Sequence, residues 1–329
     1  MVWLIFVGSS ALLVFAAMQL AKYGDAIAVR TRLGGMFVGT LLMAGATSLP
    51  ELLTGISSLN QGVPDLAAGN LLGSNMFNMF VLALLDLLFR QERILRRVAT
   101  RHALTASLAT LLIGMTAFFT LADIDVRLGW VGVDSLLLLA TYVAGVSVIQ
   151  SGNRGSGGDA APEEELEGIP TLVRALIGFS LAAGVLIVVT PWLVSSAKEI
   201  AEITGLSAGF VGTALVALVT SLPELATTIA AVRIGAFDLA IGNLFGSNAF
   251  NVVALGLTDF FYLPGRFLGV VDPSFALVAL LGLILTCLAL IGNLARVERR
   301  LFFIEIDALV ILLVYLGGMW FLYARGIGA

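Results

Sequence analysis

The chain carries Ala-Thr-Ser-Leu-Pro-Glu-Leu at residues 46–52 and repeats it as Val-Thr-Ser-Leu-Pro-Glu-Leu at residues 219–225. Both copies stand inside stretches apolar enough to cross a lipid bilayer. A carboxylate at the centre of a membrane helix costs roughly 2.5–3.5 kcal/mol on insertion scales. Glu51 and Glu224 therefore indicate a functional site within a membrane protein.

A second motif follows each proline motif at the same distance. Gly-Asn-Leu-Leu-Gly-Ser-Asn-Met-Phe-Asn at residues 69–78 is answered by Gly-Asn-Leu-Phe-Gly-Ser-Asn-Ala-Phe-Asn at residues 242–251. Both motifs keep one offset, since 224 − 51 and 251 − 78 each equal 173. The same offset relates other pairs: Asp65 and Asp238, Asp86 and Asp259, Asp134 and Asp307, Tyr142 and Tyr315. The chain is therefore an internal repeat.

Composition places the chain in the membrane class. Of the 329 residues, 59% are hydrophobic and 12% are charged, whereas soluble domains carry about 25% charged residues. The single cysteine, Cys287, excludes an internal disulfide and a cysteine-based metal cluster. The single histidine, His102, stands in a basic loop, where we expect it to be solvated and not a metal ligand.

Apolar stretches long enough to cross about 30 Å of hydrocarbon recur ten times. They lie near residues 3–24, 35–60, 65–88, 102–121, 129–150, 172–196, 208–233, 238–262, 273–294 and 303–324. We predict an all-α membrane protein with ten transmembrane helices, of which the second and the seventh are broken by proline.

The offset divides these spans into two halves of five. Residues 1–150 form the N-terminal five-helix repeat, 151–170 a short cytoplasmic linker rich in Gly, Ser and Glu, and 171–329 the C-terminal repeat. An odd number of spans in each half turns the second half upside down relative to the first. This gives an inverted repeat with a pseudo-two-fold axis in the membrane plane.

Positive charge predicts the orientation, because Lys and Arg gather on the cytoplasmic side. With the N-terminus outside, cytoplasmic loops hold thirteen of the eighteen Lys and Arg. These are Arg30, Arg32, Arg90, Arg93, Arg96, Arg97, Arg101, Arg154, Arg174, Arg233, Arg296, Arg299 and Arg300. We expect an integral membrane protein with both termini outside.

The proline motif suits a cation site. Pro50 has no N–H, and its ring crowds the carbonyl of Ala46, so the helix is predicted to open near Thr47. Unsatisfied carbonyls are tolerated inside a membrane only where protein, water or an ion meets them. Pro223 has the same effect in the second half. Hydroxyl groups flank both breaks, from Thr47, Ser48, Thr220 and Ser221.

The second motif adds further oxygen atoms. Its small residues let helix backbones approach closely, and Ser74 and Asn78 share one helix face because they are four residues apart. Ser247 and Asn251 repeat this spacing. Carboxylate, hydroxyl, amide and carbonyl oxygens together favour hard cations such as Ca²⁺, bound at about 2.3–2.6 Å, and also Na⁺. One such motif alone would fit ordinary helix packing as well as a site, but two copies in register, each with a glutamate, favour a site.

Other acidic residues have alternative interpretations. Asp86 and Asp259 are predicted as end caps or secondary conduits. Asp65 and Asp238 are predicted as helix caps, with attraction of cations at the entrances as the alternative. A rival hypothesis makes Asp86 and Asp259 the dyad of an intramembrane aspartyl protease. They lack a Gly-x-Gly-Asp or Tyr-Asp context, and that hypothesis leaves both glutamate motifs unexplained. We expect a carrier that is not an enzyme; two opposed broken helices also favour it over a channel.

The two motifs, present twice, resemble the α-repeats of the Na⁺/Ca²⁺ exchanger branch of the cation/Ca²⁺ exchanger superfamily, in its compact prokaryotic form. The resemblance covers essentially the whole chain. It implies secondary antiport of Ca²⁺ against Na⁺ by alternating access, with spans one and six sliding past a rigid core. It implies no prosthetic group, no nucleic acid and no obligatory protein partner, only the transported ions and membrane lipid.

The resemblance also implies roles for individual residues. Glu51 and Glu224 would ligate Ca²⁺, and Thr47 and Thr220 would contribute backbone carbonyls. The flanking Na⁺ sites would use Ser48, Ser74, Ser221 and Ser247 and the carbonyls of Ala44 and Ala217.

One pair departs from the commonest family pattern, because Asn78 and Asn251 are both Asn where one is often Asp. The site then holds two carboxylates, which one Ca²⁺, two Na⁺ or two H⁺ would neutralise. The Na⁺:Ca²⁺ stoichiometry stays open, and H⁺/Ca²⁺ exchange and K⁺-dependent Na⁺/Ca²⁺ exchange remain alternatives. Against H⁺, that branch typically places Gly-Asn before its glutamate, where this chain has Thr-Ser-Leu-Pro.

Overall fold

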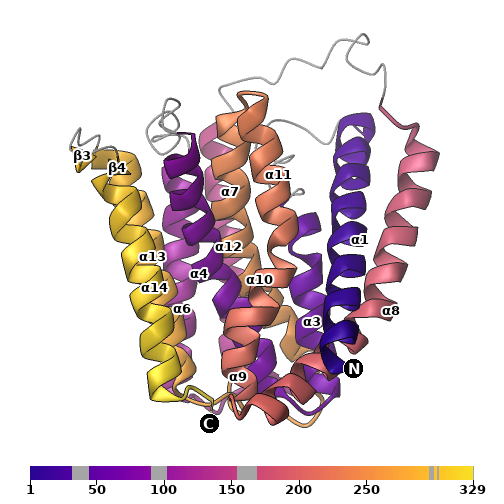
Figure 1. Ribbon diagram of the computed structural model, residues 1–329, viewed down its shortest axis with the longest axis vertical. Helices are drawn as coiled ribbons and strands as arrows, with labels where there is room; N and C mark the ends of the chain where they lie inside the picture. Colours follow the sequence, from indigo (N-terminus) through magenta and orange to yellow (C-terminus); the bar gives the residue numbers. More distant parts are fainter. Residues whose placement is uncertain (32–43, 90–101, 154–168, 296–299, 302–303, 329) are drawn as a thin grey trace.

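The computed structural model describes residues 1–31, 44–89, 102–153, 169–295, 300–301 and 304–328, and this part of the chain is predominantly helical (Figure 1). Nine helices within it are long and apolar enough to cross a membrane. The second expected span, near 35–60, is described only from residue 44 onward. The prediction of an all-α membrane protein is confirmed.

The first half contains five described helices and one short hairpin. The helices are α1 (Val2–Thr31), α3 (Leu49–Asn60), α4 (Pro64–Leu88), α6 (Ala103–Ala122) and α7 (Val133–Asn153). Strands β1 (Arg127–Leu128) and β2 (Val131–Gly132) pair antiparallel just before α7. Gly129 in their turn has a φ of 69°, a left-handed conformation that glycine adopts without strain.

The second half repeats this order. Its elements are α8 (Leu172–Thr204), α9 (Ala208–Val211), the π-helix η2 (Gly212–Val216), α10 (Ala217–Thr220), α11 (Leu222–Arg233), α12 (Phe237–Asp259), α13 (Phe275–Ala295), β3 (Arg300–Leu301), β4 (Ile304–Glu305) and α14 (Ile306–Arg325). The seventh expected span, 208–233, is therefore the sequence of helical pieces from α9 to α11.

The helices α1 and α8 are longer than predicted. The sequence placed the ends of these spans near residues 24 and 196, but the helices continue to Thr31 and Thr204. With 33 residues and a rise of about 1.5 Å per residue, α8 extends for about 50 Å. The hydropathy pattern does not reveal these helix ends, because their last turns carry polar and charged side chains.

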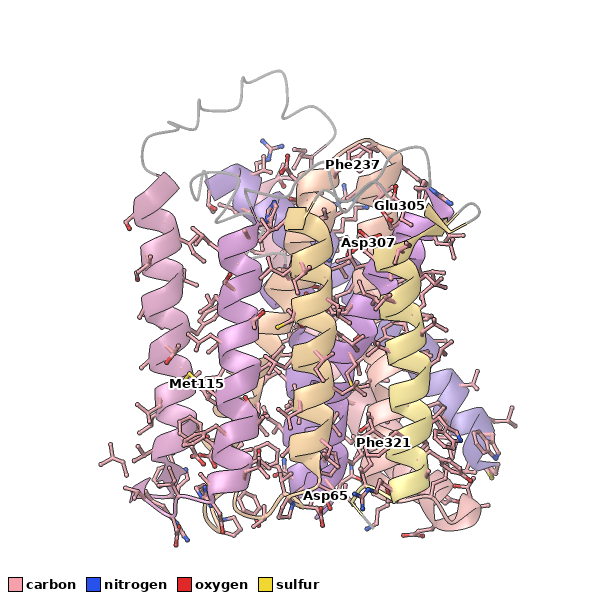
Figure 2. All side chains as sticks on the ribbon, turned by 90° about the vertical axis from the view of Figure 1, so that its left-hand side faces the viewer. Asp65, Met115, Phe237, Glu305, Asp307 and Phe321 are labelled. Carbon is pink, nitrogen blue, oxygen red and sulfur yellow. The ribbon has the colours of Figure 1, made fainter. Side chains whose placement is uncertain are left out.

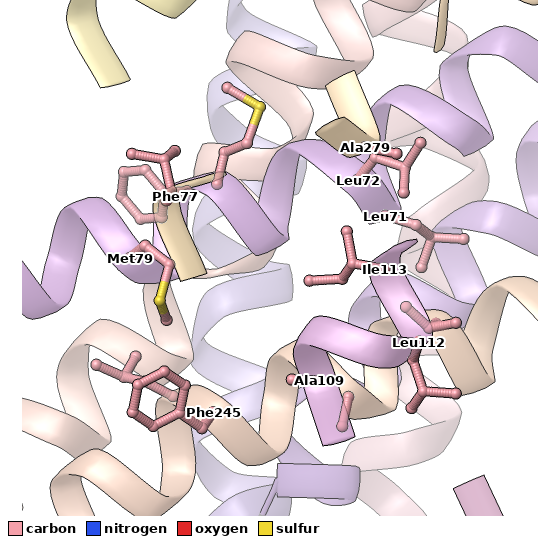
Figure 3. Close-up of a cluster of buried hydrophobic side chains, with 14 of the residues drawn as sticks. Leu71, Leu72, Phe77, Met79, Ala109, Leu112, Ile113, Phe245 and Ala279 are labelled. Atoms are coloured by element: carbon pink, nitrogen blue, oxygen red, sulfur yellow. The ribbon is translucent and has the colours of Figure 1, made fainter. Parts of the chain in front are cut away.

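The helices form a central pair, a covering layer and a separate pair at one edge (Figure 1). The central helices α4 and α12 are almost wholly buried, and α6, α7, α13 and α14 pack around them. Their shared core includes Leu71, Met79, Ile113 and Phe245, which Figure 3 shows in close-up. At the opposite edge, α1 and α8 pack on each other and leave much of their apolar surface exposed.

Glycine brings α4 and the π-helix η2 into backbone contact. A Cβ atom added at Gly73 would lie 2.6 Å from the carbonyl oxygen of Thr213, and one added at Gly212 would lie 2.6 Å from that of Leu66. No side chain fits at either position without moving backbone. The small residues of the second motif thus permit the close approach that their composition predicted.

Three expectations about polar residues outside the site were wrong. The N-cap positions of α4 and α12 are Val63 and Ala236, not Asp65 and Asp238. The Asp65 carboxylate instead accepts the backbone N–H of Asp272 at 2.9 Å. His102 is not freely solvated, because its Nε2 lies 3.5 Å from a carboxylate oxygen of Asp238. Each of these side chains reaches another segment, which local sequence cannot reveal.

Candidate cation-binding site

The two proline motifs form matching helix breaks. Ser48 (φ −89°, ψ 6°) and Ser221 (φ −90°, ψ 4°) leave helical geometry, and a new helix begins at the next residue with proline in its first turn. The serine amides still donate to the carbonyls of Ala44, at 3.0 Å, and Ala217, at 3.1 Å. The break therefore begins after the serine amide in both halves.

The backbone carbonyl oxygen of the threonine just before each break lacks its helical hydrogen bond. Within the described breaks, neither Glu51 nor Glu224 donates its backbone N–H to the threonine carbonyl four residues earlier. Thr47 and Thr220 thus each present a carbonyl oxygen without its usual helical donor. The sequence predicted the opening at these threonines, and the structure places it there.

Each break holds the carboxylate of the other half. The hydroxyl of Ser48 donates to Oε1 of Glu224 at 3.1 Å, and the hydroxyl of Ser221 donates to Oε1 of Glu51 at 3.2 Å. Both glutamates are buried, and each carboxylate is held by the serine that stands three residues before the other glutamate. Two acidic side chains 173 positions apart therefore belong to one cluster.

The second oxygen of each carboxylate is left for a ligand. Oε2 of Glu51 and Oε2 of Glu224 are buried and accept no hydrogen bond from the residues that the structure describes. Burying an ionised carboxylate is costly unless a cation or hydrogen-bond donors compensate it. This arrangement attracts a positively charged ligand.

The asparagines of the second motif are paired across the two halves. Nδ2 of Asn78 donates to Oδ1 of Asn248, and Nδ2 of Asn251 donates to Oδ1 of Asn75, both at 3.0 Å. Among the described residues, Oδ1 of Asn78, Oδ1 of Asn251 and the hydroxyl of Ser74 have no hydrogen-bond partner and are buried. These atoms add neutral oxygens to the two carboxylates.

The threonine hydroxyls tie the breaks to the second motif. The hydroxyl of Thr47 lies 3.5 Å from that of Ser247 and 3.2 Å from the Ala44 carbonyl, to which it donates. The hydroxyl of Thr220 donates to Oδ1 of Asn70 at 2.9 Å, with a weaker contact of 3.4 Å to the Ala217 carbonyl.

All twelve residues predicted for the site are buried, with at most 1% exposure. They are Ala44, Thr47, Ser48, Glu51, Ser74, Asn78, Ala217, Thr220, Ser221, Glu224, Ser247 and Asn251. Sequence reasoning missed the supporting residues Asn70, Asn75, Asn243, Asn248 and Thr286. The four asparagines could have been found, because each recurs at the 173-residue offset. Thr286 could not, because its counterpart is Ile113.

The paired aspartates outside the site lie in separate places. Asp259 accepts the backbone N–H groups of Gly132, at 2.8 Å, and Phe267, at 2.5 Å. Asp86 instead belongs to a group with Glu305 and Asp307, whose carboxylate oxygens lie within 4.8 Å of one another. Figure 2 shows Glu305 and Asp307 near the end of the molecule opposite Asp65. Asp86 and Asp259 are thus held in different surroundings, which does not fit a protease dyad.

Two buried helix breaks lie together between helices of membrane length, and the described residues around them offer carboxylate, hydroxyl, amide and carbonyl oxygens. This combination is that of a membrane carrier of hard cations. The model of the family described as sodium/calcium exchanger protein matches residues 1–149 and 174–324, so the chain belongs to this family. It is an integral membrane protein of a family of transporters that exchange cations for Ca²⁺. The family implies Ca²⁺ and Na⁺ as transported ions.

Individual relatives agree with the family match. The chain is 30% identical over 227 residues to the inner membrane protein YrbG of Escherichia coli, covering 68% of each chain. It is 26% identical over 273 residues to the sodium/calcium exchanger MaX1 of Methanosarcina acetivorans, covering 73% of this chain and 77% of the relative. The solved structure of the sodium-calcium exchanger NCX_Mj has the same fold, with a TM-score of 0.62, 23% identity, and coverage of 97% and 99%.

Proposed function

We propose that this protein is a secondary antiporter that exchanges Ca²⁺ for Na⁺ by alternating access, with the ions bound mid-membrane between its two halves. One observation carries the proposal: the reciprocal hydrogen bonds from Ser48 to Glu224 and from Ser221 to Glu51. They bring two carboxylates from oppositely inserted halves into one buried cluster. A divalent cation between them would neutralise both.

Ca²⁺ would bind to the two glutamates and the two open carbonyls. Oε2 of Glu51 and Oε2 of Glu224 supply the charge, and the carbonyl oxygens of Thr47 and Thr220 complete a set drawn equally from both halves. Ca²⁺ accepts six to eight oxygen ligands in flexible geometry, at about 2.3–2.6 Å. The amide oxygens of Asn78 and Asn251 offer two further neutral ligands.

Na⁺ would occupy flanking positions that share these oxygens. The hydroxyls of Ser48, Ser74, Ser221 and Ser247 and the carbonyls of Ala44 and Ala217 are the proposed ligands. In the present structure the two alanine carbonyls accept hydrogen bonds from a serine amide and a threonine hydroxyl. Binding there requires the threonine hydroxyl to turn away, so Na⁺ entry would rearrange the same threonines that hold Ca²⁺.

Competition for shared oxygens explains exchange rather than leak. Ca²⁺ or two Na⁺ leave the two-carboxylate site neutral, whereas the empty site leaves two dehydrated carboxylates repelling each other. The carrier must pass through an occluded conformation to change from one open conformation to the other. That occluded conformation is therefore unfavourable when no ion is bound. The pair α1 and α8, which pack chiefly on each other, would move relative to the core of the other helices.

The orientation and the organisation of the chain are part of the proposal. The charge distribution supports an orientation with both termini outside, and the resemblance to compact prokaryotic exchangers supports a location in a prokaryotic plasma (inner) membrane. Most of the arginines on which it rests lie outside the described residues. So does most of the linker at 151–170, which would join the repeats 1–150 and 171–329 on the cytoplasmic side.

The test is Ca²⁺ flux in proteoliposomes with Na⁺, K⁺ and H⁺ gradients varied one at a time. An outward Na⁺ gradient at fixed pH should drive Ca²⁺ uptake without K⁺. Uptake that follows only the pH gradient would replace Na⁺ by H⁺, and a K⁺ requirement would make the exchanger K⁺-dependent. Ca²⁺ uptake that no gradient drives, or a flux that Glu51→Gln leaves intact, would contradict the proposal.

A further inference from the structure

An asparagine can serve a cation site only if its amide faces the right way. The side chain ends in an oxygen, which binds cations, and an NH₂ group, which repels them. The two ends have nearly the same shape, so packing alone does not choose between them. Hydrogen bonds on the side away from the ion must make that choice for Asn78 and Asn251.

For Asn78 this choice is made by a chain of hydrogen bonds that has a fixed direction. Nδ2 of Asn78 donates to Oδ1 of Asn248 at 3.0 Å. Nδ2 of Asn248 donates to the backbone carbonyl of Asn75 at 3.2 Å and to the hydroxyl oxygen of Thr286 at 3.5 Å. The Thr286 hydroxyl gives its own proton to the carbonyl of Gly282 at 2.8 Å.

Both ends of this chain are acceptors that cannot donate. A backbone carbonyl carries no proton, and the only proton of the Thr286 hydroxyl is used on Gly282. Asn248 must therefore turn its NH₂ toward Asn75 and Thr286 and its oxygen toward Asn78. Asn78 must then turn its NH₂ toward Asn248, which leaves its oxygen for the site.

The matching arm in the other half has no such anchor among the residues that the structure describes. Nδ2 of Asn251 donates to Oδ1 of Asn75 at 3.0 Å, but Nδ2 of Asn75 is buried and has no partner among the described residues. The counterpart of Thr286 is Ile113, since 286 − 173 is 113. Asn75 and Ile113 lie against the same point, within 3.8 and 3.9 Å of a Cβ built on Gly282. Figure 3 shows Ile113 among apolar side chains, which offer no acceptor.

We propose that Asn248 and Thr286 are positioning residues that hold the oxygen of Asn78 toward the cation, and that Ile113 leaves the equivalent arm through Asn75 and Asn251 unanchored. This inference rests on the proposed function, because it assumes that Asn78 and Asn251 present oxygens to Ca²⁺ or Na⁺. It assigns a role in ion affinity to α13, which lies outside both repeated motifs.

The test compares Ca²⁺ dependence, maximal flux and thermal unfolding for matched variants. Thr286→Val removes the hydroxyl and keeps nearly the same side-chain shape. The KM for Ca²⁺ should rise about 3–10-fold, which is the effect expected from the loss of one hydrogen bond of modest strength. Thr286→Ser keeps the hydroxyl, so its KM for Ca²⁺ should equal that of the wild-type protein. Asn248→Ala removes the whole support and should raise KM about 10–100-fold, as loss of a ligand-orienting partner typically does.

The complementary variant adds the missing anchor. In Ile113→Thr the new hydroxyl can donate to the carbonyl of Ala109 four residues earlier, as helical threonines commonly do. Its oxygen then accepts from Nδ2 of Asn75. The KM for Ca²⁺ should fall by a factor of about 3–10, the reverse of the Thr286→Val effect.

The outcomes separate this inference from the proposed function. If the wild-type protein shows Na⁺-driven Ca²⁺ flux but Thr286→Val lowers only the unfolding temperature or the maximal flux, with KM unchanged, the positioning role is wrong. An Ile113→Thr variant that folds and leaves KM unchanged would also overturn it. A wild-type protein without Na⁺-driven Ca²⁺ flux would instead contradict the proposed function.

Discussion

The two halves agree at the carboxylates and differ at the residues behind them. Ser48 and Ser221 hold the opposite glutamates at 3.1 and 3.2 Å, in nearly identical fashion. Asn70 donates to the Glu51 carbonyl at 3.2 Å and accepts from Thr220. Its counterpart Asn243 donates to Thr227 and Thr228 instead. The repeat thus preserves the charged centre and lets its supports diverge.

This difference is what an alternating-access carrier needs. A site shared by two identical halves in identical environments would be open to both sides or to neither. In inverted-repeat carriers, one repeat or helix bundle moves against the other around a fixed site between them. If the proposed function is right, the unequal surroundings of Asn70 and Asn243 belong to one asymmetric state of the carrier.

The largest expected effect comes from breaking the symmetric centre. Glu51→Gln and Glu224→Gln should each weaken Ca²⁺ binding by at least about 10²-fold, because removing one partner of a buried charge set costs about 3–5 kcal/mol. Equilibrium Ca²⁺ binding to purified protein measures this. The matched control is Asp125→Asn, since Asp125 is exposed and the Arg127 guanidinium beside it holds the pKa of its carboxyl below the usual range. A large loss in only one of the two glutamate variants would contradict a shared site.

The next effect sharpens the comparison at the glycines. Gly73→Ala should lower the free energy of unfolding by about 1–3 kcal/mol, because the added Cβ would meet the Thr213 backbone at 2.6 Å. Gly246→Ala should cost less as far as the described residues go, since among them its Cβ would meet the Cβ of Ala44 alone, at 3.0 Å. Thermal unfolding in detergent measures both variants. A Gly73→Ala variant as stable as the wild-type protein would show that the π-helix η2 does not contact α4 as closely as described.

A third prediction concerns the serines that hold the carboxylates. Ser48→Ala and Ser221→Ala should each weaken Ca²⁺ binding about tenfold, which corresponds to about 1.4 kcal/mol, within the range for a hydrogen bond near a charged group. The two losses of affinity should be nearly equal, because the two hydrogen bonds from serine to glutamate have nearly the same length, 3.1 and 3.2 Å. Effects that differ by more than a few-fold in Ca²⁺ titrations would mean that the carboxylates are held differently.

The smallest expected effect distinguishes the two supporting asparagines. Asn70→Ala should destabilise the ion-free protein by about 1 kcal/mol more than Asn243→Ala, because Asn70 joins the first-half break to Thr220 of the second half. Among the described residues, the side chain of Asn243 hydrogen-bonds to its own half alone. Thermal unfolding without Ca²⁺ measures the difference, and a larger effect at Asn243 would reverse the described asymmetry.

Much of this architecture is predictable because the chain repeats itself. Hydropathy located the spans, proline located both breaks, and the spacing of Ser74 and Asn78 placed their oxygens in the buried interior. Contacts between distant segments were not predictable in this way. Asp65 binds the Asp272 amide and His102 approaches Asp238, contrary to the local expectations for these side chains.

Other features escape the sequence because they depend on backbone geometry or on a broken repeat. Residues 212–216 form a π-helix although their composition resembles that of any apolar helix. Thr286 accepts a hydrogen bond from the Asn248 amide. The internal repeat does not predict this contact, because the residue equivalent to Thr286 in the first half, Ile113, is apolar. The ligands of a repeated site can be found by self-comparison, and the residues that orient those ligands require the structure.

The most direct test of the shared site is a crystal structure of the protein soaked in Ca²⁺, with the ion located by its anomalous scattering. A single central peak should lie about 2.3–2.6 Å from Oε2 of Glu51 and from Oε2 of Glu224. A peak bound by only one glutamate, or no peak between the two breaks at saturating Ca²⁺, would contradict the account.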